Sequence, residues 1–280
     1  MKTRISAIVG LLCVLGAPLS ASAGAELQTM PSGTYEPYLS FMGGVAIPFS
    51  EDATFQGELP PTGPSGVAVP RVINDVDYQM KQSWGGSAGI WFPTRNKLWG
   101  FDLGAEITGY VWYPDVACCL DYYNRDPATG AGTTTEINGI YIGSNLMLRY
   151  PLAISEAYPN GRWFPYVGIG VGAHQFAMKP GGQKGVGFQN AITELRDTAV
   201  AFQGVGGIKA HLFKYVAVFA EAKYLHASHS GLTTDRFGLS GPAFDPNTGL
   251  QGVQVANTYE STINTILVHV GMSMHFDIKP

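Results

Sequence analysis

The chain has 280 residues, of which 45% are hydrophobic and only 14% are charged, and it contains 36 glycines. This balance is poor in charge and rich in glycine for a soluble globular protein. The formal net charge of −4 argues against a nucleic acid as the partner.

The first 23 residues have the pattern of a secretory signal peptide. Two basic residues open it, an apolar stretch covers residues 5–19, and a small-residue cleavage site ends it at Ala21-Ser22-Ala23. The apolar stretch is too short to cross a bilayer as a helix. We therefore expect residues 1–23 to be removed and residues 24–280 to form one exported domain with a net charge of about −6.

Beyond the signal, no run of 18 apolar residues exists, which excludes helical membrane spans. Eight segments instead alternate apolar and polar residues with the period of two that a β-strand requires. In chain order they cover residues 35–47, 78–92, 98–113, 136–150, 163–177, 198–212, 215–228 and 260–276.

The connections between these segments alternate in length. Residues 93–97, 151–162 and 213–214 are short connections, and the four others have roughly 20 to 30 residues. Short periplasmic turns and long extracellular loops are the connectivity typical of a transmembrane barrel. Alternation alone does not exclude a water-soluble sandwich, in which the apolar face would be hidden.

Aromatic residues separate these two folds better, because membrane barrels place them at both interfaces. One group lies beside the short turns: Trp91, Phe92, Trp99, Phe101, Tyr150, Trp163, Phe164, Phe213, Tyr215 and Phe276. A second group lies at the opposite strand ends: Tyr78, Trp84, Trp112, Tyr113, Phe176, Phe202 and Tyr224. The sequence therefore predicts an all-β fold, an eight-stranded antiparallel up-and-down transmembrane β-barrel with four long extracellular loops.

A barrel of eight strands is only wide enough for its inward side chains to fill it. Six charged residues have inward parity: Asp102, Glu106, Arg149, Lys209, Glu221 and Lys223. Because an unpaired buried charge is costly, we expect Asp102 to pair with Arg149 near the periplasmic end. We expect Glu106 and Glu221 to share Lys209 and Lys223 higher up.

This charge network has two interpretations, a gated path for protons or ions and a structural plug. Inward glycines make room for the inward Tyr38, Tyr110, Tyr141 and Tyr166, which is how a small barrel is packed and which favours the plug. No inward face is broadly apolar by this pattern, and that argues against the carriage of a small hydrophobic molecule.

Cys118 and Cys119 are adjacent in the second long loop. A disulfide between neighbours would be strained, and exported thiols seldom stay free, so we expect a strained or an intermolecular disulfide. A metal site there would lack ligands. The Asp-Pro turns at 126–130 and 245–249 have too few carboxylates for calcium. No cofactor or metal is predicted.

Residues 35–276 resemble the small eight-stranded outer-membrane barrels, the family of the opacity-type proteins and of the transmembrane domain of outer-membrane protein A. The resemblance rests on the eight segments, on the strands PYVGIGVGAH and YVAVFAEAKY, and on a final amphipathic strand with Phe276, although four residues follow that aromatic. It implies a place in the bacterial outer membrane among lipid and lipopolysaccharide, and recognition of the last strand by the assembly machinery. It further implies a non-enzymatic role in envelope integrity and in binding an extracellular ligand through the loops.

A shorter stretch resembles the lipid A deacylases, which are eight-stranded outer-membrane enzymes. His226-Ala227-Ser228 is followed by Gly231, and Glu260-Ser261 opens the last segment. The resemblance implies Ser228 as the nucleophile, His226 as the general base and Glu260 as the group that orients the base. His229 replaces the family's asparagine, and about 30 residues separate Ser228 from Glu260. A serine esterase acting on lipopolysaccharide acyl chains is therefore the alternative function.

Overall fold

A computed structural model describes residues 33–49, 51–56, 71–76, 78–116, 136–179, 195–233 and 258–278. The predicted signal peptide, Cys118, Cys119 and both Asp-Pro turns lie outside these residues. No helix in the described part of the chain is long and apolar enough to cross a membrane.

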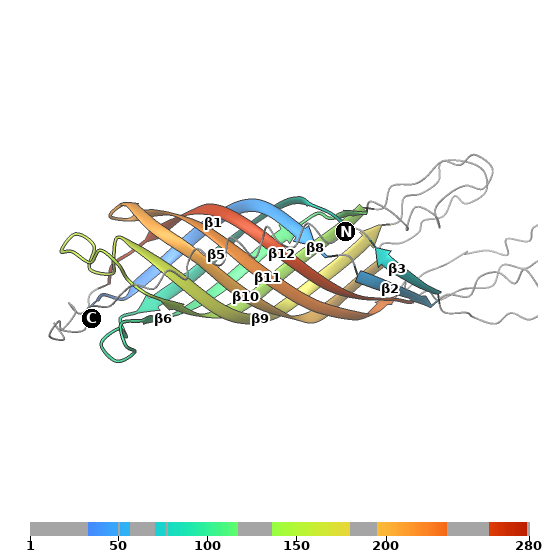
Figure 1. Cartoon of the computed structure of the whole chain (residues 1–280), viewed down its shortest axis with the longest axis horizontal. Coiled ribbons are helices and arrows are strands. Elements are labelled where there is room, and N and C mark those ends of the chain that lie inside the picture. Colours follow the sequence, from blue (N-terminus) through green and yellow to red (C-terminus); the bar gives the residue numbers. More distant parts are fainter. Residues whose placement is uncertain are drawn as a thin grey trace, which may run out of the picture. The chain divides into compact units, whose positions relative to one another are not determined.

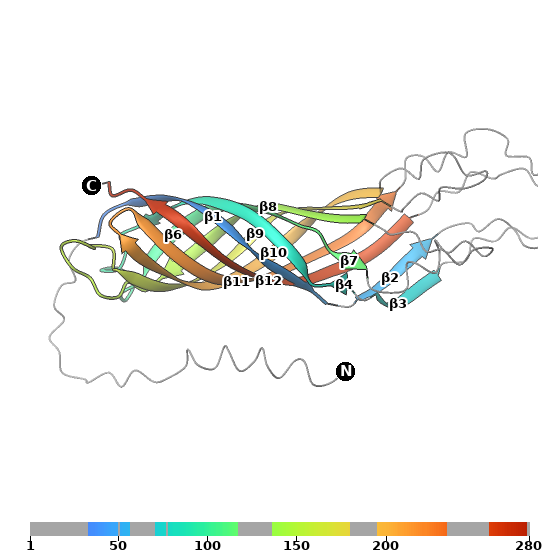
Figure 2. The ribbon, with the colours of Figure 1, turned by 90° about the horizontal axis from the view of Figure 1, so that it is seen from above.

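Eight long strands form one antiparallel sheet that closes on itself (Figures 1 and 2). Closure follows from β1, which pairs with β5 on one side and with β12 on the other. The eight strands are β1 (Glu36–Pro48), β5 (Lys81–Phe92), β6 (Asp102–Trp112), β8 (Glu136–Arg149), β9 (Trp163–Lys179), β10 (Leu195–Phe213), β11 (Val216–Thr233) and β12 (Thr258–His275). The predicted fold class and the eight predicted strands are confirmed.

Two short pairings were not predicted. The hairpin of β2 (Glu51–Gln56) and β3 (Arg71–Val76) continues the sheet beyond β1, because β2 pairs with the first residues of β12. The strands β4 (Tyr78–Gln79) and β7 (Asp115–Val116) form a separate two-residue pair. Part of the first long connection is therefore strand.

Strand length differs between the two sides of the barrel. Strands β9 to β12 have 17 to 19 residues, whereas β1, β5, β6 and β8 have 11 to 14. The short turns and the bridge between Tyr35 and Ile278 lie at one end, which we call the periplasmic end. The opposite end is the extracellular end.

The outer surface of the barrel is apolar. Every one of the eight long strands exposes at least one large apolar side chain, and Ile142, Ile169 and Val270 are each more than 60% exposed. On β8 the neighbouring Tyr141 is fully buried in the interior, as the two-residue period requires. A closed sheet with such a surface satisfies its backbone internally and suits hydrocarbon rather than water.

Exposed aromatic side chains lie at both ends of this surface. Trp99, Phe101, Trp163, Phe213, Tyr215 and Phe276 lie at the periplasmic end, and Trp84, Tyr113, Phe202 and Tyr224 toward the other. Four aromatics assigned to these belts from the sequence were assigned wrongly, because their parity turns them inward and they are at most 1% exposed: Trp91, Phe164, Trp112 and Phe176.

Candidate functional site

The interior of the barrel is filled by large side chains that lie over glycines on neighbouring strands. A Cβ atom built at Gly89 would lie 2.6 Å from the Tyr38 hydroxyl, and one at Gly207 would lie 2.7 Å from that of Tyr166. Tyr38 and Tyr166 are at most 5% exposed. The glycines are therefore required by packing, as the sequence predicted.

An ion-paired layer lies at the periplasmic end of the interior. Arg149 contacts Asp102 through Nε at 3.3 Å and donates to Glu36 Oε2 from Nη1 at 2.6 Å. All three residues are at most 1% exposed. The sequence paired Arg149 with Asp102, and the structure adds Glu36 as the closer partner.

Arg95 completes this layer from the turn between β5 and β6. Its side chain donates to both carboxylate oxygens of Asp102, at 3.0 and 2.6 Å, and its backbone NH donates to the same group at 3.1 Å. It also donates to the Pro159 carbonyl at 2.9 Å and to Asn160 at 3.1 Å. The Arg95 guanidinium thus links its own turn and the turn that contains Pro159 and Asn160 to Asp102 on β6.

Glu106 occupies the middle of the interior and is held by neutral groups. It accepts hydrogen bonds from the Tyr38 hydroxyl and from Asn145 Nδ2, each at 2.8 Å. The sequence had assigned Lys209 and Lys223 to share the two glutamates. Within the described residues no ion pair joins Glu106 to either lysine, so that part of the prediction is wrong.

Glu221 does pair with Lys223, at 2.9 Å, and accepts from the Tyr166 hydroxyl at 2.8 Å. Lys209 is 4% exposed, and its Nζ lies 4.2 Å from the centre of the Tyr38 ring and 5.0 Å from that of Phe219. A cation over aromatic faces is stabilised without a carboxylate in contact. Lys209 therefore balances the negative charge of the interior without a direct ion pair to Glu106 or Glu221.

A chain of hydrogen bonds crosses the barrel between opposite walls. Tyr110 on β6 donates to Gln203 on β10 at 2.9 Å, and Gln203 donates to Asn145 on β8 at 2.9 Å. Asn145 in turn reaches Glu106. Side chains from non-adjacent strands are thereby linked across the lumen.

The extracellular half of the interior contains an apolar cluster, which the sequence pattern did not predict. Its buried side chains include Ala46, Trp112, Ile137, Phe176, Ala201, Leu225, Ala227, Ile263 and Leu267. The inward faces of the single strands are mixed, as the sequence indicated, and the cluster forms only where several strands meet. Small, branched and aromatic side chains from seven strands meet there, and the pattern of a single strand does not reveal this.

A short polar relay is embedded beside this apolar cluster. His174 Nδ1 lies 2.9 Å from His229 Nε2, and His229 Nδ1 lies 3.0 Å from Asp197 Oδ2. Trp112 stacks on His174 with 6.1 Å between ring centres. His229 thus faces inward, opposite in direction to His226 and Ser228.

The residues of the alternative esterase face outward, as their parity predicted, but in an order that does not suit a catalytic relay. Ser228 lies opposite Thr262 and contacts it at 3.3 Å, whereas His226 lies opposite Asn264 and contacts it at 2.8 Å. Glu260 is four residues from Asn264 along β12, about 13 Å. The serine therefore lies between the histidine and the glutamate, while the relay requires the histidine in the middle.

Two residues of the charged layer were missed by the sequence interpretation. Glu36 has the same parity as the inward Tyr38, so alternation could have found it. Arg95 belongs to a turn, where no alternation applies. Its turn contains Trp99 and Gly100 with positive φ angles of 49° and 92°, a conformation in which glycine is favoured.

No protein-family model matches the chain, and no curated protein matches it. Among solved structures it is similar to the outer membrane protein OprG of Pseudomonas aeruginosa, with 12% identity, 88% of this chain and 99% of that chain covered, and a TM-score of 0.45. It is similar to Neisserial surface protein A at 12% identity, with 86% and 97% covered and a TM-score of 0.40. It is also similar to Ail, the attachment invasion locus protein of Yersinia pestis, at 8% identity, with 86% and 99% covered and a TM-score of 0.35.

The protein is an eight-stranded barrel of the bacterial outer membrane, the location that the sequence predicted. The closed strand order and the apolar outer surface carry this conclusion.

Proposed function

We propose that the protein is a non-conducting outer-membrane barrel that contributes to envelope integrity and displays its long connections for interaction at the cell surface. The observation that carries the proposal is the ion-paired layer at the periplasmic end. Arg95, Asp102 and Arg149 are at most 2% exposed, and they join two turns to the wall by direct contacts.

The charge balance of the interior supports a plug. The buried cations Arg95, Arg149, Lys209 and Lys223 are matched in number by the buried anions Glu36, Asp102, Glu106 and Glu221. A permeating ion would have to separate these groups in a space with little water, where each separated charge costs several kcal/mol. Solute conduction is therefore disfavoured.

The surface role rests on where the long connections leave the barrel. Residues 57–70, 117–135, 180–194 and 234–257 follow strands that end at the extracellular end. Segments held at their ends by a rigid scaffold are the usual carriers of recognition. An extracellular ligand is accordingly the proposed partner, besides membrane lipid and lipopolysaccharide. The outer-membrane assembly machinery would recognise β12 and Phe276.

Single-channel recording in planar bilayers tests the plug. The wild-type protein should show no conductance steps above the lipid background. Glu106→Ala and Arg95→Ala each remove one link of the interior and should allow at most brief, small events, because many other side chains remain. Stable, large steps in wild type would contradict the proposal, and a large conductance in Glu106→Ala would show a gate rather than a plug.

A deletion strain tests the envelope role. Loss of the protein should increase killing by large antibiotics that the intact outer membrane excludes. A variant in which residues 234–257 are replaced by a short glycine-serine turn should restore this barrier without restoring surface binding. Equal antibiotic sensitivity with and without the protein would refute the envelope role.

The esterase alternative has a direct test. Expression in cells with fully acylated lipid A, followed by mass spectrometry of lipid A, should show the same acyl chains for wild type and Ser228→Ala. Removal of one acyl chain by wild type alone would establish the deacylase and overturn the non-enzymatic proposal.

A further inference from the structure

Three side chains able to bind a metal meet at the periplasmic end of the interior. They are Glu36 of β1, His211 of β10 and His275 of β12, and one donor atom of each lies within 4.8 Å of the others. Their exposed fractions are 1%, 6% and 2%. Residues far apart in the sequence thus converge at one buried point.

The register of the sheet accounts for this convergence. His211 lies opposite Ala217 on β11, and Ala217 lies opposite Ser273 on β12. His275 lies two residues beyond Ser273 on β12, and its ring is 4.7 Å from that of His211, measured between the ring centres.

The facing atoms of the cluster are not satisfied by hydrogen bonds. Glu36 Oε1 lies 2.5 Å from His275 Nδ1 and 3.5 Å from His211 Nε2. Although the first contact is short, neither Glu36 Oε1 nor His275 Nδ1 has a hydrogen bond of acceptable geometry to any described residue. Buried polar atoms are nearly always paired. A cation between these atoms would satisfy both.

The remaining atoms of two of these side chains are held in place. Arg149 Nη1 donates to Glu36 Oε2 at 2.6 Å, which leaves Oε1 directed at the histidines. Ser273 Oγ lies 2.7 Å from His275 Nε2. A proton on Nε2, donated to this hydroxyl, leaves the Nδ1 lone pair free, which is how outer-shell contacts orient metal ligands.

We propose that Glu36, His211 and His275 bind a divalent transition-metal ion of the zinc class. Two imidazoles and one carboxylate form a common protein site for such ions. Two donors on a tetrahedral zinc ion lie roughly 3.3 Å apart, close to the Glu36–His211 separation. The Glu36–His275 contact would widen by about 0.8 Å.

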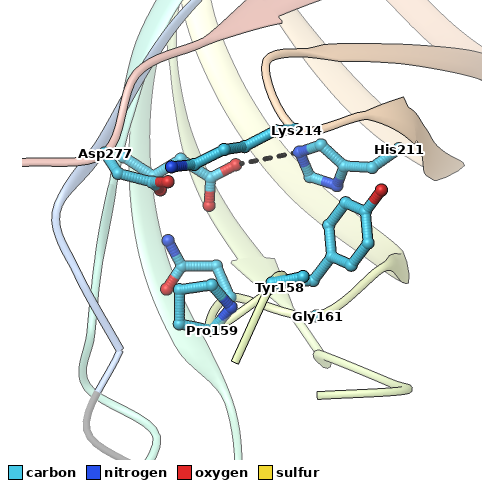
Figure 3. A pocket seen from close by; sticks show the side chains of 9 residues that line it. Tyr158, Pro159, Gly161, His211, Lys214 and Asp277 are labelled. Atoms are coloured by element: carbon cyan, nitrogen blue, oxygen red, sulfur yellow. Dashed lines mark ion pairs between the residues drawn. The ribbon is translucent and has the colours of Figure 1, made fainter. Parts of the chain in front are cut away.

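Two of the three ligands, Glu36 and His211, also line a small pocket at the periplasmic end, and we assign the fourth ligand position to this pocket. Tyr158, Lys214 and Asp277 line it together with Glu36 and His211 (Figure 3). Its polar lining suits a metal-bound water. The ion itself would connect the first long strand to the last one and to β10, and would thereby stabilise the seam that closes the barrel.

A protonated His275 paired with Glu36 is the competing explanation of the short contact. That pair would be insensitive to chelators and would not require His211. The two explanations therefore differ in metal stoichiometry and in the effect of His211→Ala.

Isothermal titration with ZnCl₂ decides between them, with untagged protein purified from outer membranes, stripped with a chelator and held in detergent micelles. We expect one zinc ion per chain and a higher melting temperature with zinc, because a ligand that binds the folded state stabilises it. His211→Ala, His275→Ala and Glu36→Gln should each weaken binding by more than about 100-fold, beyond the roughly 10- to 100-fold typical of an outer-shell change.

The second histidine cluster offers matched controls. His174→Ala and His229→Ala remove imidazoles at the extracellular end and should leave zinc binding unchanged. No zinc binding by the wild type, or loss of binding only in these control variants, would overturn the proposal. If the ligand variants do not fold, Ser273→Ala decides: a roughly 10- to 100-fold weakening supports the site, and an unchanged affinity overturns it.

Discussion

The two halves of the barrel interior are closed in different ways. The periplasmic half is closed by charged groups such as Arg149, which contacts both Glu36 and Asp102. The extracellular half is closed by apolar packing around residues such as Leu225 and Leu267. The same barrel can therefore be filled by ion pairs at one end and by apolar side chains at the other. The two-residue period of a strand determines which side chains point inward, but it does not determine whether they are polar or apolar.

The largest effect is expected in the charged half. Arg149→Ala removes the cation that two buried carboxylates share, and Glu36 loses its contact at 2.6 Å. Leaving a buried charge without its partner costs about 3–5 kcal/mol. Urea unfolding in lipid vesicles, followed by circular dichroism, should show this loss in the free energy of unfolding.

Arg162→Ala is the matched control for this prediction. Arg162 is exposed in the turn before β9, where it lies 5.9 Å from the Tyr158 ring. Its removal should change stability by no more than about 0.5 kcal/mol. Similar losses for both arginines would show that the buried pairs do not close the periplasmic half.

A smaller loss is expected in the apolar half. Leu225→Ala leaves a cavity among fully buried side chains and should lower the free energy of unfolding by at least about 2 kcal/mol. Leu212→Ala, at a position 50% exposed on the outer surface, leaves no interior cavity and should cost clearly less. Equal effects would indicate that the extracellular half is loosely packed and open to water.

The smallest effect is expected where the two halves meet. Tyr110→Phe removes the hydroxyl that donates to Gln203 and leaves a buried acceptor unpaired, at a cost of about 1–2 kcal/mol. Tyr224→Phe removes an exposed hydroxyl bonded to Asn264 at 2.8 Å and should cost less than about 0.5 kcal/mol. If Tyr110→Phe lowered the free energy of unfolding as much as Arg149→Ala does, the contacts that most stabilise the interior would lie in the middle of the barrel.

The strands could be predicted from the sequence because the period of two is a local property. The inward direction of Glu106, Arg149 and Glu221 followed from it directly, and so did the outward direction of His226 and Ser228. The alternation does not determine where a strand ends. β11 runs to Thr233, five residues beyond its predicted end.

The partners of inward residues could not be predicted in the same way. The alternation predicts that Lys209 points inward, but the rings of Tyr38 and Phe219 that its ammonium group contacts belong to other strands. Arg95 enters the interior from a turn. The proposed metal-binding cluster depends on the register of β10, β11 and β12, and register across three strands is not visible in one sequence.

The unequal strand lengths give the barrel a slanted upper rim. At about 3.3 Å per residue and a tilt near 40°, a strand of 18 residues such as β11 rises roughly 45 Å, whereas the 11 residues of β6 rise about 28 Å. The apolar band of such barrels is about 25 Å tall, so among the eight long strands β9 to β12 stand well clear of the lipid, and the β2–β3 hairpin paired with β12 extends the same flank. An antibody or phage descending on the cell would meet that flank first, and epitopes selected on intact cells should be concentrated there.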